Sequence, residues 1–189
     1  MDSAQNKKSE KKTGRKKPKK ITAQYLHNAG LYYLQRFAAS RGQFRAVMLR
    51  KIKRSCMEHR DQNYETCAAM VEETVEKFER AGLLNDELYT RGAVISLRRQ
   101  GKSKNAIMSK LKTRGVAATL VTETLGAQDT ENSELRAALT VLRRKKAGPF
   151  GEKDSEKILA ALARAGFSYD TAGRAMKMDR AEAEEILEN

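Results

Sequence analysis

The chain has 189 residues, of which 40% are hydrophobic and 33% charged, and its formal net charge is +14. This composition is too apolar for a wholly disordered chain and too charged for one thick core, so we expect a few small units. No apolar run approaches the ~20 residues that cross a bilayer, and the basic start lacks the apolar stretch of a secretory signal.

The first 20 residues form a basic segment with nine Lys or Arg against two acidic residues and no apolar residue at helical spacing. We therefore predict a disordered tail over residues 1–20. Such a block attracts polyanions by releasing their counterions. A solubilising arm without a dedicated partner is the alternative. Membrane-surface binding is disfavoured, because the tail has no Trp, Phe or Leu to insert.

Apolar residues at helical spacing follow the tail, and strand signals are nearly absent. We predict a first repeat of three helices over residues 21–84. Its apolar faces lie within residues 26–37, 44–52 and 71–78, and the third helix ends at a glycine. Residues 55–64 are interpreted as an insertion between the second and third helices.

A second repeat of three helices is predicted over residues 85–126. Asn85 or Asp86 can cap its first helix and Ser103 its second, because these short polar side chains accept hydrogen bonds from the first helical turn. The residues expected on the inner face of its first helix are Tyr89, Ala93 and Leu97.

The third repeat is predicted over residues 127–189, with an extra helix at its end. The stretch LARAGF at 162–167 superposes on LKTRGV at 111–116, in the second repeat. Because units of this size cannot bury an apolar face alone, neighbours must stack. The fold class is therefore all-α, with three tandem three-helix repeats forming an elongated, curved array.

Catalytic and metal-binding patterns are hard to find in the sequence. The spacing of Cys56, His59 and Cys67 supplies three ligands with no recognised zinc pattern. The chain also lacks a phosphate-binding glycine loop and a nucleophile motif. We expect a protein without catalysis, metal or cofactor. Two cysteines make no disulfide framework and favour a cytoplasmic location.

Clusters of basic residues are the stronger signal. Cations at a helix C-terminus stabilise it by up to ~1 kcal/mol, which explains one or two charges but not four in a row. We therefore predict that these clusters face a polyanion or an acidic protein groove. The candidate binding residues are Arg98, Arg99, Lys102, Lys104, Lys110, Lys112, Arg114, Arg143, Arg144, Lys145 and Lys146.

Two segments, 101–125 and 166–187, have helix-turn-helix proportions. The last helix of the second segment is acidic and would repel phosphate. The first segment is better charged, but its second helix has no obvious base-reading side chain. A stand-alone DNA- or RNA-binding protein is the alternative function.

Several stretches resemble the RecX family, over roughly residues 22–178. They are residues 78–116, with a Gly-Leu-Leu step, an acidic region, a basic-Gly turn and Leu-x-x-Arg-Gly-Val, then 142–146 and 162–176. The family usually has Asp where this chain has Asn85, and Asn caps a helix about as well.

The resemblance implies a regulator, mainly an inhibitor, of the recombinase RecA in DNA repair and the SOS response. Proteins of this family lie in the groove of the RecA–DNA filament and modulate its ATPase, strand-exchange and co-protease activities. The expected partners are therefore the RecA filament and single- or double-stranded DNA, and the expected state is a monomer. The candidate binding residues are assigned from charge and repeat position, not carried over from the family.

Overall fold

The computed structural model describes residues 17–130 and 132–188, which form ten α-helices and no strand. The helices are α1 (Ala23–Leu34), α2 (Arg41–Glu58), α3 (Tyr64–Arg80), α4 (Asp86–Arg99), α5 (Lys104–Thr113), α6 (Ala118–Gln128), α7 (Ser133–Lys145), α8 (Ser155–Arg164), α9 (Tyr169–Lys177) and α10 (Arg180–Glu188). The prediction of an all-α fold is confirmed. Over the described residues, no helix has the length and apolar character needed to cross a membrane.

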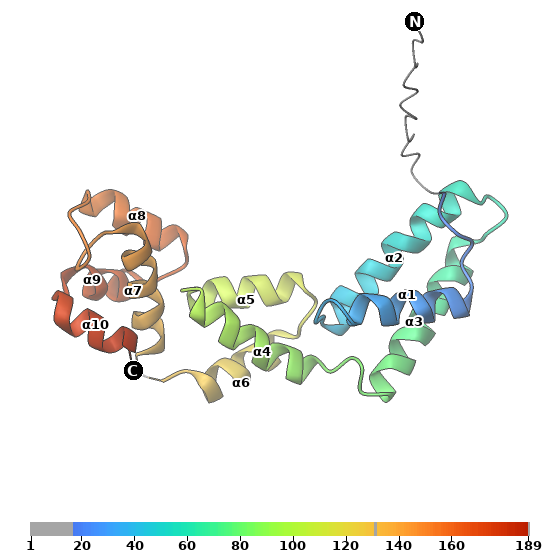
Figure 1. Cartoon of the computed structure of the whole chain (residues 1–189), viewed down its shortest axis with the longest axis horizontal. Helices are drawn as coiled ribbons and strands as arrows, with labels where there is room; N and C mark the ends of the chain where they lie inside the picture. The colour runs from blue at the N-terminus through green and yellow to red at the C-terminus, as the bar shows by residue number, and fades with distance from the viewer. Residues whose placement is uncertain (1–16, 131, 189) are drawn as a thin grey trace, which may run out of the picture.

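The helices gather into three groups that follow one another along the longest axis of the molecule (Figure 1). We name them unit 1 (α1–α3), unit 2 (α4–α6) and unit 3 (α7–α10). Each unit has its own cluster of buried apolar side chains. In each unit the third helix packs against both of the others, and α10 adds a further layer on α7. The core is thus divided among three small clusters rather than gathered in one.

The helix starts follow the capping residues that the sequence predicts. The side chain of Asn85 accepts a hydrogen bond of 2.9 Å from the backbone N–H of Leu88. Ser103 likewise accepts from Ala106 at 3.1 Å. Each cap satisfies one backbone donor that has no partner within the helix. Both predicted starts are therefore confirmed.

The predicted inner face of α4 is partly wrong. Leu97 is buried as expected, but Thr90 and Val94 are the other two buried residues of this helix, while Tyr89 and Ala93 are half-buried. The centre of the buried face is thus shifted by roughly 65° around the helix from the predicted face, and Tyr89 and Ala93 still pack against the edge of the core. Thr90 can be buried because its hydroxyl donates to the carbonyl of Asp86 at 2.6 Å.

Two predicted boundaries in unit 1 are also wrong. The first helix ends at Leu34, so Phe37 leaves its apolar face and is 55% exposed. The second helix continues to Glu58, so most of the predicted insertion 55–64 is helical or short loop. Ser55 stays in the helix and is 1% exposed, because its hydroxyl finds acceptors outside the helix.

The last residues of the predicted tail contact unit 1. Residues 1–16 lie outside the described residues. The segment that follows them is tied to the end of α2, since Ser55 Oγ donates to the carbonyl of Lys19 at 2.8 Å. The Gln62 side chain pairs with both backbone groups of Ile21 at 2.9 Å. The prediction of disorder through residue 20 is therefore wrong for its last residues.

Candidate binding surface and the junctions between units

The eleven candidate cations lie on three stretches of units 2 and 3. They occupy the end of α4 with the turn after it, then α5, and finally the end of α7. Arg99, Lys102, Lys104, Lys112 and the four residues 143–146 are exposed, and Lys110 and Arg114 are half-buried. Among the described residues, no carboxylate lies within ion-pair distance of any of these ten. Within the described parts of the chain, these ten charges therefore have no internal counter-charge, and eight of them belong to exposed side chains.

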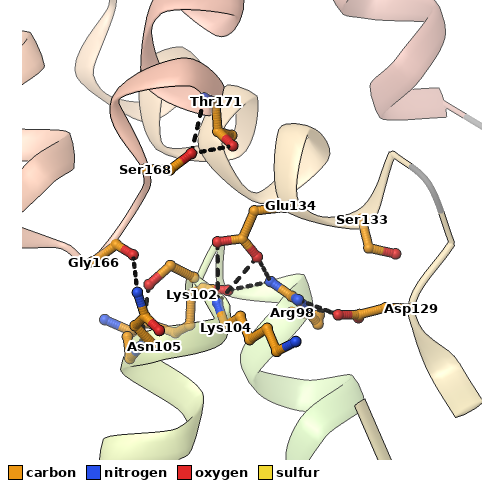
Figure 2. Close-up of polar contacts among 12 residues, drawn as sticks. Arg98, Lys102, Lys104, Asn105, Asp129, Ser133, Glu134, Gly166, Ser168 and Thr171 are labelled. Carbon is orange, nitrogen blue, oxygen red and sulfur yellow. Dashed lines mark hydrogen bonds and ion pairs between the residues drawn. The ribbon is translucent and has the colours of Figure 1, made fainter. Parts of the chain in front are cut away.

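Arg98 differs from the other ten, and we remove it from the candidate surface. Its side chain is 13% exposed and forms ion pairs with Asp129 and Glu134 (Figure 2). Nη1 lies 2.6 Å from Glu134 Oε2, and Nε lies 2.9 Å from Asp129 Oδ1. The expectation that Arg98 faces an external partner fails, because its charge is already paired inside the protein.

The pKa of Arg98 reflects this pairing. Burial opposes the charged form, but hydrogen bonds to Asp129 and Glu134 outweigh it and raise the pKa above its ordinary value. The guanidinium also donates to the carbonyl of Lys102 at 3.1 Å. Arg98 therefore joins the end of α4 to the segment that leads into α7, and it remains charged at every accessible pH.

The two acidic partners were missed in the sequence. Asp129 ends α6 and Glu134 lies in the first turn of α7, about 30 residues after the arginine. A signal for them was present, because four acidic residues, Glu123, Asp129, Glu131 and Glu134, stand between the basic clusters that end at Arg114 and begin at Arg143. The cations at the end of α4 are visible in the sequence, but the acidic residues that the stacking of units brings to them are not.

Units 2 and 3 meet at a junction built on the start of α5. Ser103, the N-cap residue, donates its hydroxyl proton to the carbonyl of Ala165 at 2.6 Å, across the junction. The next residue, Lys104, donates its backbone N–H to Glu134 at 3.0 Å. Asn105 adds a hydrogen bond of 3.0 Å to the carbonyl of Gly166. Side chains at one helix start thus satisfy backbone groups at the end of another.

Units 1 and 2 meet at a junction of the same design, built on the start of α2. Ser40 caps α2 and donates to the carbonyl of Arg114. The next residue, Arg41, donates its backbone N–H to Asp86 at 2.7 Å, in the first turn of α4. Two seryl caps that lie 63 residues apart therefore perform the same task at successive junctions.

Glycines allow the close approach at both junctions. Gly115 has φ +74° and Gly166 has φ +88°, a region that side chains disfavour. A Cβ atom at Gly115 would lie 2.9 Å from the Cα of Gly42, and one at Gly166 would lie 2.7 Å from the hydroxyl of Ser103. Each glycine thus closes a helix and also admits the neighbouring unit.

The candidate metal ligands do not assemble a site. His59 Nε2 lies 2.8 Å from the carbonyl of Pro18, and Cys67 is buried between helices. Burial raises the pKa of the Cys67 thiol, with a further contribution from Cys56. No group of three metal-ligating side chains occurs in the parts of the chain that the structure describes.

Comparison with known proteins yields consistent relatives. No family model matches the chain. The chain is 41% identical over 179 residues to regulatory protein RecX of Myxococcus xanthus, covering 91% of this chain and 95% of the relative. It is 32% identical over 168 residues to regulatory protein RecX of Agrobacterium fabrum, covering 86% and 88%.

A solved structure shares the fold. The crystal structure of RecX from Lactobacillus salivarius superposes with a TM-score of 0.59 over 86% of this chain and 97% of the other, at 19% identity. The fold and the sequence identity thus point the same way. On the strength of the extended identity to the Myxococcus and Agrobacterium proteins, this chain belongs to the RecX family of regulatory proteins.

Proposed function

We propose that this protein regulates the recombinase RecA, mainly as an inhibitor, by binding the RecA–DNA filament without catalysing a reaction itself. Membership of a family of regulatory proteins is the observation that carries the proposal. The surface supports it, because ten cations without internal counter-charges lie on two neighbouring units. The protein would act as a cytoplasmic monomer and would modulate ATP hydrolysis, strand exchange and co-protease activity.

The mode of binding follows from shape and charge. The units lie in a row (Figure 1), so cations on units 2 and 3 can contact sites that no compact globule of this length would reach together. Gly101 packs against the carbonyl of Ala137 and the side chain of Thr140, which places Arg143 and Arg144 about one turn further along α7. We infer a cationic ridge that follows a filament groove and meets acidic subunits or DNA phosphates.

The alternative, a stand-alone protein that reads DNA or RNA sequence, has weaker support. In the helix-turn-helix-like segment 101–125, the second helix is α6. The exposed residues in its first two turns are Ala118, Thr119, Thr122 and Glu123. None carries a positive charge, whereas recognition helices that enter the major groove present donors and cations to bases and phosphates.

A charge-reversal experiment tests the proposal. The triple variant Arg99→Glu, Lys102→Glu, Lys104→Glu removes the exposed cations at the turn between α4 and α5 and leaves Arg98 in place. We expect it to lose inhibition of the DNA-dependent RecA ATPase at substoichiometric amounts, because each reversed charge replaces an attraction with a repulsion. Helicity by circular dichroism should stay unchanged.

A second triple variant serves as the matched control. Lys53→Glu, Arg54→Glu, Arg60→Glu changes the net charge by the same amount at exposed positions of unit 1. It should inhibit like the wild type at matched salt. Full inhibition by the variant at the α4–α5 turn would refute the proposed surface. Tight nucleic-acid binding that RecA does not alter would favour the alternative function.

A further inference from the structure

An open apolar groove lies beside the junction of units 1 and 2. Its volume is about 420 Å³, and its lining comes from α1, the loop before α2, the turn after α3, and α4. Three large apolar side chains at this groove reach solvent, with Phe37 55%, Leu83 47% and Leu88 70% exposed. Exposed apolar side chains grouped around one hollow are typical of a binding surface.

One charged residue, Arg114, lies among the residues that line this groove. Its Nη1 donates to the hydroxyl of Tyr89 at 2.6 Å, and that hydroxyl lies 3.3 Å from the side-chain carbonyl of Gln43. Within residues 17–130 and 132–188, no carboxylate is in ion-pair distance of Arg114. A guanidinium has five donors in a planar fork, so most of its hydrogen-bonding capacity remains unused here.

The junction between units 2 and 3 shows how an arginine beside a hollow is paired with carboxylates in this protein. A hollow there lies beside the contact that Ser103 makes with unit 3, and its lining is charged and polar. The Arg98 guanidinium in this hollow is paired with Asp129 and Glu134. The groove at the first junction has an arginine and apolar walls but no such carboxylates. Unused guanidinium donors beside apolar walls are complementary to a carboxylate with apolar neighbours.

Two segments of this chain are poor occupants of the groove. Residues 1–16 carry six basic and two acidic groups, which would bring like charge to Arg114. The acidic helix α10 has the right composition, but its Ile186 and Leu187 already pack against the core of unit 3. A second copy would have to unpack that helix to fill the groove. We therefore take the occupant to be a segment of a different protein, and saturable self-association of this protein through the groove would overturn that choice.

We propose that this groove docks a protein segment that presents a bulky apolar side chain beside a carboxylate. The apolar group contacts the walls near Leu88, and the carboxylate receives the free donors of Arg114. A charge-assisted, bidentate pair in a partly dehydrated groove supplies both orientation and selectivity. Arg114 belongs both to the candidate surface and to this groove, whereas the apolar walls of the groove lie outside the candidate surface. The identity of the protein that carries the segment rests on the proposed function.

A matched pair of small probes tests the groove on the whole protein. In nuclear magnetic resonance titrations, 4-phenylbutanoate should shift the Arg114 Nε–H signal and the Leu88 methyl signals in a saturable way. The uncharged 4-phenylbutanamide should bind about five- to tenfold more weakly, because it offers no charge-assisted acceptor. In Arg114→Gln the two probes should bind alike. Equal affinity of the two probes for the wild type would overturn the proposal.

A steric variant tests the same groove without disturbing the fold. Gly92 lies on α4 at the groove, and a Cβ atom there meets nothing within 4 Å. Gly92→Leu should fill the space, favour the helix and abolish probe binding. Gly126→Leu is the control, because Gly126 on α6 is equally unobstructed and lies outside the groove. Retained probe binding by Gly92→Leu would refute docking in this groove.

The same two variants separate this inference from the proposed function. If the wild type inhibits the RecA ATPase, Gly92→Leu should raise the concentration for half-inhibition about tenfold while Gly126→Leu leaves it unchanged. Inhibition by the wild type with no effect of Gly92→Leu would exclude RecA as the carrier of the docked segment. If the wild type itself does not inhibit, the proposed function fails, and the probe titrations still decide whether the groove binds.

Discussion

Arg98 and Arg99 are adjacent in the sequence but have different environments. Arg98 turns toward unit 3 and pairs with two carboxylates, while the side chain of Arg99 is exposed. This half-buried cluster of one arginine and two carboxylates orients α4 against α7, because separating the three groups would leave charges without partners where water reaches them only in part. A count of charges in the sequence therefore gives one cation too many for the candidate binding surface. The binding hypothesis rests on the other ten cations.

Arg98→Met should destabilise the protein by about 2 kcal/mol, because it leaves Asp129 and Glu134 partly buried without their counter-charge. Arg99→Met, a change of the same size at the next position, should stay within about 0.5 kcal/mol of the wild type. Urea unfolding followed by circular dichroism measures both. Equal effects of the two substitutions would show that the Arg98 ion pairs contribute nothing.

At the scale of whole elements, the serines that start α2 and α5 each cap their own helix and also form a hydrogen bond to the neighbouring unit. The hydroxyl of Ser103 accepts from the N–H of Ala106 and also donates to the carbonyl of Ala165 in the next unit. The residue is fully buried for this reason. Helix capping, which is a local interaction, thereby becomes part of the contact between units.

Alanine substitution of two capping serines separates helix capping from the contact between units. Ser168 caps α9 at an exposed position and makes both of its hydrogen bonds to Thr171 within the same helix turn. Ser168→Ala should cost about 1 kcal/mol, the ordinary value of a cap. Ser103→Ala should cost about 2 kcal/mol, because it also leaves the Ala165 carbonyl without a partner. Equal losses in thermal unfolding experiments would contradict a role for Ser103 at the junction.

At the scale of the whole molecule, the row of units in Figure 1 depends on two narrow contacts. Gly42 and Gly115 bring two backbones together at the first contact, where any side chain would force the units apart. Since each unit has its own apolar cluster, such a change can alter the arrangement of units without unfolding any of them. Binding to an extended partner depends on this arrangement.

Gly115→Ala should therefore change the shape of the protein, whereas Gly82→Ala should not. Both glycines have positive φ, +74° and +70°, so each substitution carries a similar conformational cost of about 1 kcal/mol. A Cβ at Gly82 meets nothing within 4 Å, while one at Gly115 meets the backbone of Gly42. Small-angle X-ray scattering should show a changed maximum dimension for Gly115→Ala alone. Identical scattering curves for the two variants would argue against a rigid first junction.

The helical class, the capped starts at Asn85 and Ser103, and the position of the basic clusters could all be predicted from the amino-acid sequence. These features depend on residues within about four positions of one another, so spacing and side-chain type are sufficient to predict them. Family membership was recognisable for a similar reason, since its motifs are short and occur in a fixed order.

Three features could not be predicted and follow from packing between distant segments. They are the ion pairs of Arg98, the buried face of α4, and the contacts between units. Arg98 meets partners 31 and 36 residues away, and Ser103 meets one 62 residues away. The groove at Arg114 likewise exists only because unit 1 and unit 2 meet there. Contacts over such separations depend on how whole helices pack, and no local pattern of charge or hydrophobicity encodes which distant residues that packing brings together.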